Sequence, residues 1–254
     1  MTATAEKANC ASSVAYVSTK ADVLVIGGGT AGAVAAIQAA RAGAKTLLME
    51  MGGQLGGTMT AGGVAFPGLF HAWGRQVIAG IGWELAAETV RRDGGTLPDF
   101  TGTPARHSDH QLHINQFFYA LLAEDKCLKA GVEIAYYEFP LSIETSAGAW
   151  LVECAGPGTR RRVACRQIVD CTGNADAVGM LGMPRLRGEE TQPGSMLFKC
   201  GAAYEPGREQ LQAVYVHGAD SSNSVTRTAA NIAGRRAVLE QLAAGRLVHL
   251  QPET

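Results

Sequence analysis

Three glycines near the start of the chain have the spacing of a nucleotide-binding loop. Gly27, Gly29 and Gly32 satisfy the pattern G-x-G-x-x-G. The first allows a tight turn, the second lets a pyrophosphate approach the backbone, and the third lets a helix pack closely on a strand. Glu50 stands where a carboxylate can accept hydrogen bonds from an adenosine ribose, and its charge disfavours a 2′-phosphate there. The residues expected to form this dinucleotide site are Gly27, Gly28, Gly29, Thr30, Ala31, Gly32 and Glu50.

The segments around these glycines have the pattern of a β-α-β unit. Val23–Ile26 is an all-apolar run, as in a strand buried on both faces of a parallel sheet. Thr30–Ala42 carries apolar residues at helical spacing and stops at Gly43, and Lys45–Glu50 is a second strand. A glycine-rich turn that binds nothing is the alternative. Strand, glycines, helix, strand and acid in register favour a dinucleotide, without deciding which one.

Three longer helices are predicted farther along the chain. Arg75–Arg92 and Leu112–Ala130 carry apolar residues at helical spacing and are followed by glycines, and Val225–Ala244 has Gly245 as its stop. In the second of them, the face expected to be buried carries Ile114, Phe117, Phe118, Leu121 and Leu122.

A third parallel strand and an antiparallel meander are predicted in the middle of the chain. Val132–Tyr137 has the apolar pattern of the strand. The turn signals SAG and GPG then separate Leu141–Thr145, Ala149–Cys154 and Arg162–Val169, which form the meander. A further strand is expected in GSMLFKCGAAY, which begins at Gly194.

A glycine-rich segment, Met51–Phe70, follows the second strand. It is too rich in glycine for a helix and too long for a simple turn. Loops of this length inside compact domains tend to be functional, and glycines allow a ligand to approach the backbone closely. An ordinary mobile loop is the alternative.

The composition is that of a globular protein with a sizeable core. Of 254 residues, 46% are hydrophobic and 18% charged, and the formal net charge is -1. The sequence has no dense Lys/Arg stripe that would attract nucleic acid and no run of about 18 apolar residues that would span a membrane. The six cysteines include no C-x-x-C pair and are expected to be reduced thiols, mostly buried.

The sequence before Ala21 lacks the apolar core of a secretory signal. A cytoplasmic protein is therefore expected, with no nucleic-acid partner and no membrane partner. His110 and His113 are three residues apart, but no neighbouring ligand set makes a metal site credible, and none is expected.

Four further stretches, taken with the glycine loop, resemble a known flavoprotein family in their order and spacing. They are LGGTMTAGGV (Leu55–Val64), HAWGRQVIAGI (His71–Ile81), IVDCTGNADAVGMLGMP (Ile168–Pro184) and QPGSMLFKCG (Gln192–Gly201). Together they resemble the FAD-dependent oxidoreductase family, within the two-dinucleotide-binding-domain, or glutathione-reductase-like, superfamily.

The resemblance implies FAD as the cofactor and assigns further residues to it. At the diphosphate and ribityl chain it places Gly56, Gly57 and Thr58. Past the isoalloxazine edge it places Ala61, Gly62, Gly63 and Val64.

A turn after the meander is also implied to lie near the adenosine end of the cofactor. In the resemblance, Thr172 and Gly173 close this turn and Asp176 supports it. From the residues alone, an Asx turn that caps the end of a strand is the alternative.

The predicted fold class is α/β, a Rossmann-like FAD-binding parallel sheet with an antiparallel β-meander and the start of a second, substrate-side domain. Residues 1–20 are expected to form a flexible tail, 21–184 the FAD-binding domain, and 185–254 part of a substrate or cap region. Members that resemble this chain continue past the last predicted helix with a segment that closes over the flavin. The resemblance therefore implies a second polypeptide that completes the flavin site, or a fragment of a longer protein.

Catalysis is expected from the flavin, which carries hydride or electron chemistry itself. His71 is a candidate proton donor or acceptor, and a histidine held by hydrogen bonds in a loop is the alternative. Arg75 is a candidate anion-binding residue. The leading hypothesis is an FAD-binding oxidoreductase, or the FAD-binding part of one, acting on a small organic substrate. A catalytically inert dinucleotide-binding scaffold subunit and an NAD-dependent reductase are the alternatives.

Overall fold

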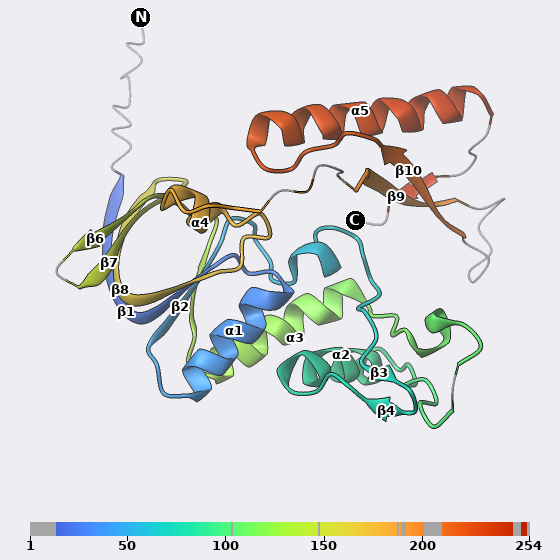
Figure 1. The fold of residues 1–254 in the computed structure, drawn as a ribbon, viewed down its shortest axis with the longest axis horizontal. Coiled ribbons are helices and arrows are strands. Elements are labelled where there is room, and N and C mark those ends of the chain that lie inside the picture. Colours follow the sequence, from blue (N-terminus) through green and yellow to red (C-terminus); the bar gives the residue numbers. More distant parts are fainter. Residues whose placement is uncertain are drawn as a thin grey trace, which may run out of the picture.

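The computed structural model describes residues 14–102, 104–146, 148–186, 188, 192–200, 210–245 and 250–252. A six-stranded sheet in the order β5-β2-β1-β8-β7-β6 forms its largest layer (Figure 1). These strands are β1 Ala15–Ile26, β2 Thr46–Glu50, β5 Glu133–Tyr136, β6 Phe139–Ser146, β7 Ala149–Gly156 and β8 Thr159–Asp170. β5, β2, β1 and β8 pair in parallel, whereas β6, β7 and β8 form an antiparallel meander. The predicted α/β fold class is confirmed.

Both faces of the central strands are buried, which explains their unbroken apolar runs. Val25 and Leu48 belong to the cluster packed against the helices, whereas Leu24 and Met49 belong to a second cluster with the meander. Successive side chains of a strand point to opposite faces. A strand with a covered surface on each side therefore needs apolar residues at consecutive positions.

β1 begins at Ala15, so the last six residues of the expected tail form part of the sheet. The reason is that β8 starts three residues earlier than expected, at Thr159, and pairs with β1 along its whole length. Arg161 on β8 strengthens this pairing, because its Nη1 donates a hydrogen bond to Thr19 Oγ1 at 2.8 Å while its Nε donates to Glu138 Oε2 at 2.7 Å. Residues 1–13 of the expected tail lie outside the described residues.

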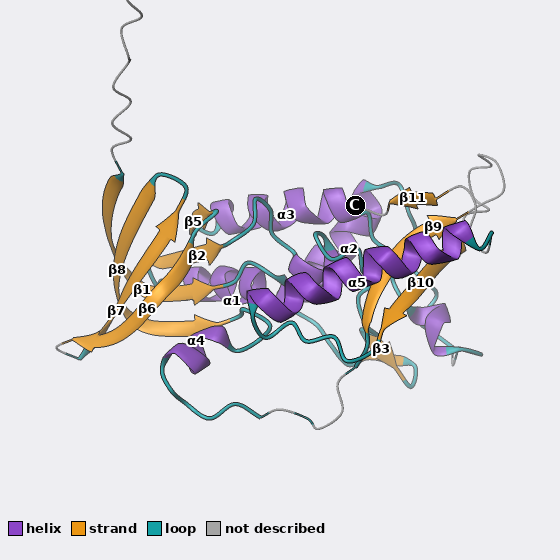
Figure 2. Ribbon diagram, turned by 90° about the horizontal axis from the view of Figure 1, so that it is seen from above, coloured by secondary structure: helices purple, strands orange, loops and turns teal. Residues whose placement is uncertain are grey.

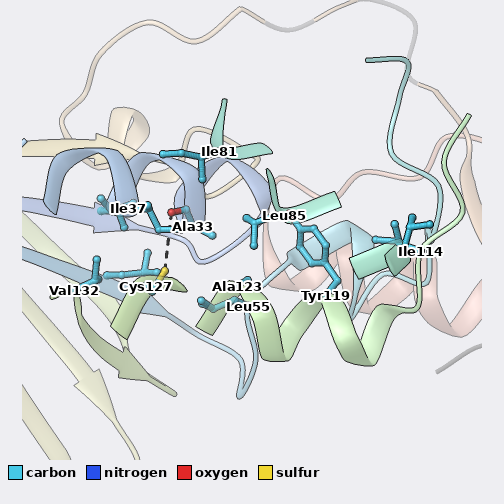
Figure 3. Close-up of a cluster of buried hydrophobic side chains, with 14 residues drawn as sticks. Ala33, Ile37, Leu55, Ile81, Leu85, Ile114, Tyr119, Ala123, Cys127 and Val132 are labelled. Carbon is cyan, nitrogen blue, oxygen red and sulfur yellow. Dashed lines mark hydrogen bonds between the residues drawn. The ribbon is translucent and has the colours of Figure 1, made fainter. Parts of the chain in front are cut away.

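Three helices pack together on one face of the sheet: α1 Thr30–Arg41, α2 Ile81–Arg92 and α3 Gln116–Lys129. Figure 3 shows the core between them, to which Ile37, Leu85 and Tyr119 each contribute a side chain. Leu55, from the glycine-rich segment after β2, is completely buried in the same core. That segment is therefore anchored to the helices rather than free in solvent.

The buried face of α3 matches the expected one only in part: Ile114 and Leu122 pack in the core as predicted, but two other expected residues do not. Phe117 and Leu121 are 69% and 47% exposed, whereas Ala123 and Cys127 are completely buried. The small side chains of Ala123 and Cys127 let α3 approach α1 closely, and Cys127 Sγ lies 4.0 Å from the carbonyl oxygen of Ala33 (Figure 3). A larger apolar stripe would hold the two helices apart.

α2 begins at Ile81, not at Arg75 as predicted. Instead, β3 His71–Ala72 and β4 Arg75–Gln76 form a hairpin joined by a two-residue turn. Both turn residues, Trp73 and Gly74, have positive φ (53° and 71°), as a type I′ turn requires. The sequence did not reveal this turn, because a type I′ turn usually carries Asn-Gly or Asp-Gly. Here the two turn residues are Trp73 and Gly74.

The chain after the meander forms a smaller layer. β9 Gly194–Cys200 pairs with β10 Gln210–Val216 and β11 Leu250–Pro252, all antiparallel. α5 Ser224–Ala243 lies alongside β9 and β10 (Figure 2). The predicted strand from Gly194 is confirmed as far as Cys200, and residues 201–204 of that stretch lie outside the described residues. The predicted long helix is confirmed.

Three short helices complete the described chain: η1 Gly57–Met59, η2 His107–His110 and α4 Asp176–Met180. Among the helices of the described segments, none has the length and apolar character that a membrane span requires. The four cysteines with described side chains, Cys127, Cys154, Cys165 and Cys171, are unpaired. Burial raises the pKa of Cys127 and of Cys154 to about 12, so both remain thiols at neutral pH.

Candidate functional site

The loop between β1 and α1 is held in place by contacts that only glycine allows. A Cβ at Gly32 would lie 1.8 Å from the carbonyl oxygen of Gly27. Gly27 has φ 99°, and a Cβ there would lie 2.4 Å from the carbonyl oxygen of Cys171. The predicted roles of these two glycines, a tight turn and close packing of helix on strand, therefore have a direct steric basis.

Gly29 stands at the N-cap of α1 and differs from its neighbours in the loop. Among the described residues, a Cβ there would meet only Gly57 Cα, at 4.0 Å, so no steric clash with them requires glycine at this position. The first turn of α1 presents backbone N–H groups without partners inside the helix, and it contains no acidic side chain. The positive end of the helix dipole and an open backbone together make an anion-binding position.

Glu50 joins the glycine loop to the segment that follows β2. Its Oε2 accepts a hydrogen bond from Gly28 N at 2.6 Å, and its Oε1 accepts one from Gly52 N at 2.6 Å. Each carboxylate oxygen retains capacity for a further hydrogen bond, so the expected ribose contact remains chemically available. The structural role of Glu50 as a bridge was not evident from the sequence, because its partners depend on how the two loops fold.

The second glycine loop lies directly against the first. Gly56 N donates to Gly28 O at 2.9 Å, and Gly29 and Gly56 pair as an isolated parallel bridge. A Cβ at Gly57 would lie 2.9 Å from Gly29 Cα. Leu55 is buried and anchors this loop. It was not predicted as a site residue from the sequence. The available signal was a large apolar residue inside a glycine-rich run.

The residues after the second glycine loop form a hydrogen-bonded turn. Thr58, at η1, accepts from Val64 N at 3.0 Å, while Gly62 N donates to Gly57 O at 3.0 Å and Gly63 N to Thr60 O at 3.1 Å. Ala61 lies within this turn. The segment expected to pass the flavin ring is thus held beside the segment expected to line the diphosphate.

The turn after β8 packs against the first glycine loop. Asp170 Oδ1 accepts hydrogen bonds from Thr172 N at 3.0 Å and Thr172 Oγ1 at 2.8 Å, and its Oδ2 accepts from Val178 N at 3.0 Å. Gly173 has φ 84°, and Asp176 N donates to Thr172 Oγ1 at 2.8 Å. The Asx-type turn considered from the sequence is present, and its backbone lies beside Gly27.

The two aspartates of this turn have opposite pKa shifts. Burial acts to raise the pKa of Asp170, but the hydrogen bonds from Thr172, Val178 and Ala177 outweigh it and leave the pKa below its usual value. Burial, followed by the nearby charge of Asp170, raises the pKa of Asp176. Asp170 is therefore the anionic centre of the turn.

Asp170→Asn is expected to destabilise the protein by about 2 kcal/mol at neutral pH. The asparagine side chain has a single oxygen, so it cannot accept hydrogen bonds from both Thr172 and Val178. The folded-state pKa lies below the unfolded value of about 3.9, so the stabilisation is complete above that value and is lost as the pH falls through the folded pKa. Urea unfolding of the wild type and of Asp170→Asn between pH 7 and about pH 3 measures how the free energy of unfolding changes with pH. Equal pH dependence in the wild type and the variant would contradict it.

The two candidate catalytic residues lie on the β3–β4 hairpin. The His71 ring stacks on Phe100 with centroids 3.7 Å apart, and it meets the edge of Trp83 at 5.1 Å. Its Nδ1 is buried and has no hydrogen-bond partner among the described residues. Burial, and then the neighbouring His110, lowers the pKa of His71. The alternative was a histidine held by hydrogen bonds in a loop. Among the described residues, Nδ1 of His71 makes no such bond.

Arg75 is exposed on β4, opposite Ala72. The contacts described for His71 are with aromatic rings and do not join the hairpin to the glycine loops. The structure thus brings together the residues expected to bind the cofactor, whereas the catalytic roles of His71 and Arg75 stay predictions.

Comparison with solved structures identifies the fold. Three structures each give a TM-score of 0.51: CabE, an aromatic hydroxylase from angucycline biosynthesis (16% identity), BexE, studied for oxidation during BE-7585A biosynthesis (18%), and a geranylgeranyl bacteriochlorophyll reductase-like protein from Thermoplasma acidophilum (14%). The match covers 73%, 74% and 74% of this chain and 38%, 39% and 49% of theirs, respectively. The chain thus spans less than half of each, and at these identities the likeness shows the fold alone.

Comparison with family models and with curated proteins gives the remaining findings. No curated protein matches the chain. The family model described as FAD dependent oxidoreductase matches residues 22–248, which include the glycine loops, Glu50 and the turn after β8. The chain therefore belongs to the FAD dependent oxidoreductase family.

Proposed function

We propose that this chain binds FAD and forms the flavin-binding part of an oxidoreductase that acts on a small organic substrate. The observation that carries the proposal is the open backbone at Gly29. It lies in the first glycine loop at the N-terminus of α1, where the second glycine loop packs directly against it. Such a position accepts the negative charge of a pyrophosphate without any side chain in the way.

The other site residues have chemistry that suits the remaining parts of FAD. Glu50 is held by two backbone N–H groups and can still accept from ribose hydroxyls. The diphosphate would be held by the backbone at Gly27 to Gly32 and at Gly56 to Thr58. The turn at Thr172, Gly173 and Asp176, which abuts the first loop through Cys171 O, would lie beside it.

The bound flavin would supply hydride or electron transfer, and the residues of this chain would bind and orient it. His71 is the candidate proton acceptor. Its lowered pKa favours the neutral imidazole, and its buried Nδ1 has no partner in the part of the chain that the structure describes. Arg75 is the candidate contact for an anionic substrate group. A second polypeptide, or a further part of the same protein, that completes the flavin site stays a prediction.

The matched variants Gly29→Ala and Gly68→Ala test the proposal. At neither position would a Cβ clash with the chain, and neither glycine has a positive φ. Both variants are therefore expected to fold as the wild type does. Gly29→Ala alone is expected to weaken FAD binding at least about tenfold, or about 1.4 kcal/mol, because its methyl group would stand between the phosphates and the backbone.

Titration followed by quenching of flavin fluorescence measures the affinity, and circular dichroism checks the fold. Equal FAD affinity in Gly29→Ala and Gly68→Ala, or no FAD binding by the wild type, would reject the proposal. A parallel titration with NADH tests the alternative reductase. Tight NADH binding without FAD binding would favour that class instead.

A further inference from the structure

A pocket lies in the smaller layer of the fold, apart from the glycine loops. It has a volume of about 220 Å³ and is formed by β9, the end of β10, the loop after it and the first half of α5. One part of its wall is apolar and includes Met196, Val216 and Ala230. Another part is polar and includes Arg227 and Asn231, which are one helical turn apart on α5.

The pocket wall is built by close packing between β9 and α5. A Cβ at Gly234 on α5 would lie 2.6 Å from Met196 Cγ, so the helix carries glycine where Met196 crosses it. A Cβ at Gly194 would lie 3.0 Å from Ala219 Cβ. The side chain of Met196, on β9, therefore packs closely against α5. The apolar wall is in place before any ligand binds.

The positive charge of the pocket comes from Arg227, not from the end of α5. Asn223 Oδ1 accepts hydrogen bonds from Val225 N and Thr226 N, both at 3.0 Å, so the first N–H groups of the helix are already satisfied. Within the described segments, the Arg227 guanidinium has no ion pair and donates no hydrogen bond, so its donors remain available.

Two carboxylates lie near this guanidinium and limit the charge that a ligand can bring. Asp220 lines the pocket, and its Oδ1 accepts from Ser222 N at 2.9 Å. Asp176 is close enough for the charges of Arg185 and Arg227 to act on it. The negative charge of Asp176 beside Arg227 disfavours a ligand that brings two negative charges, whereas a single negative charge paired with Arg227 is compatible with it.

The pocket is tied to the turn after β8. Asn174 Nδ2 donates to Ser221 O at 3.0 Å, and Ser221 Oγ donates to Asn174 Oδ1 at 3.2 Å. Ser221 lines the pocket, and Asn174 belongs to the turn between Gly173 and Asp176. A molecule in the pocket would therefore lie next to the turn that packs on the glycine loop.

We propose that this pocket binds a small organic monocarboxylate. Arg227 pairs with the carboxylate, Asn231 offers it a further hydrogen bond, and the apolar wall at Met196, Val216 and Ala230 contacts the hydrocarbon part. Planar guanidinium and carboxylate groups match in a two-point geometry, which favours arginine as the partner for this group. The site goes beyond the proposed flavin function and does not depend on it.

Benzoate is the probe and benzamide its uncharged counterpart of similar shape. Calorimetric titration, with butyrate as a second carboxylate probe, measures binding to the wild type, Arg227→Gln and Arg235→Gln. Arg235→Gln is the matched control, because it removes the same charge from an exposed position farther along α5, outside the residues that line the pocket. We expect benzoate binding to be at least tenfold weaker in Arg227→Gln, unchanged in Arg235→Gln, and weaker at high salt; benzamide is expected to bind weakly to all three.

Equal binding of benzoate to Arg227→Gln and Arg235→Gln would overturn the proposal, as would wild-type protein that binds neither benzoate nor butyrate. Ala230→Phe adds a second line of evidence, because it fills the apolar part of the pocket from an existing helix and should abolish binding. Gly29→Ala should leave benzoate binding unchanged. That variant separates failure of this proposal from failure of the proposed FAD site.

Discussion

Gly32→Ala is expected to destabilise the protein by about 3 kcal/mol, which for a chain of this length lowers the melting temperature by roughly 6 to 12 °C. The added Cβ would lie 1.8 Å from the carbonyl oxygen of Gly27, far inside the contact distance of a methyl group. The clash is with backbone, so no side chain can rotate away. Either α1 moves off the sheet or the loop at Gly27 is displaced.

The loop at Gly27 has little room for such a displacement. Gly27 N donates to Met49 O at 2.8 Å, and Cys171 N, next to the carbonyl group that abuts Gly27, donates to Ile26 O at 2.8 Å. Gly27 is thus held between the ends of β2 and β8 while its own φ is 99°. Relieving the clash would break contacts on both sides, which is why the cost exceeds that of an ordinary surface substitution.

Gly82→Ala is the control for this prediction. Gly82 lies within α2, and a Cβ there would meet nothing within 4 Å. The same chemical change should therefore stabilise the helix, by up to about 1 kcal/mol. Thermal unfolding followed by circular dichroism measures both variants. A Gly32→Ala protein that melts with the wild type would contradict the packing of α1 on the first glycine loop.

The β-α-β unit could be predicted because its signals are local. Thr30–Arg41 ends one residue before the predicted end, and β2 ends at Glu50 as predicted. Apolar runs, helical spacing and glycine stops determine these bounds without reference to the rest of the chain. The steric roles of Gly27 and Gly32 followed from the same local pattern.

The parts that could not be predicted depend on contacts between distant segments. The buried face of α3 is selected by the close approach of Cys127 to Ala33, 94 residues away, so periodicity alone chose the wrong side at Phe117 and Leu121. The strand at residues 15–20 exists because β8 supplies its partner. Neither partner can be recognised within the local sequence window.

In the candidate site, too, the residues with local signals could be predicted from the sequence, and those that depend on long-range contacts could not. Gly29 was evident from its spacing, but its meeting with Gly57 is a long-range contact that only the resemblance suggested. The pocket at Arg227 had no sequence signal at all, since its lining comes from β9, the end of β10, the loop after it and α5. Leu55 and the bridging role of Glu50 likewise became visible only once the loops were folded together.

Glu50→Gln is expected to cost roughly 2 to 3 kcal/mol of folding stability and to weaken FAD binding at least tenfold. The carboxylate accepts from Gly28 N and Gly52 N at 2.6 Å each, one on either oxygen. A glutamine amide has a single oxygen, so one of these N–H groups would face an NH2 group, donor against donor. The change keeps the shape of the side chain and removes one acceptor.

Glu144→Gln, at an exposed position on β6, is the matched control and should leave both stability and FAD affinity unchanged. Urea unfolding with and without FAD measures the two effects together. Because Glu50 holds both glycine loops, stability without FAD and affinity for FAD should fall together in Glu50→Gln. In Gly29→Ala, by contrast, only affinity should fall, since the nearest described atom to a Cβ there is Gly57 Cα, at an ordinary contact distance of 4.0 Å. Unchanged stability without FAD in Glu50→Gln would show that Glu50 is not the bridge between the two loops.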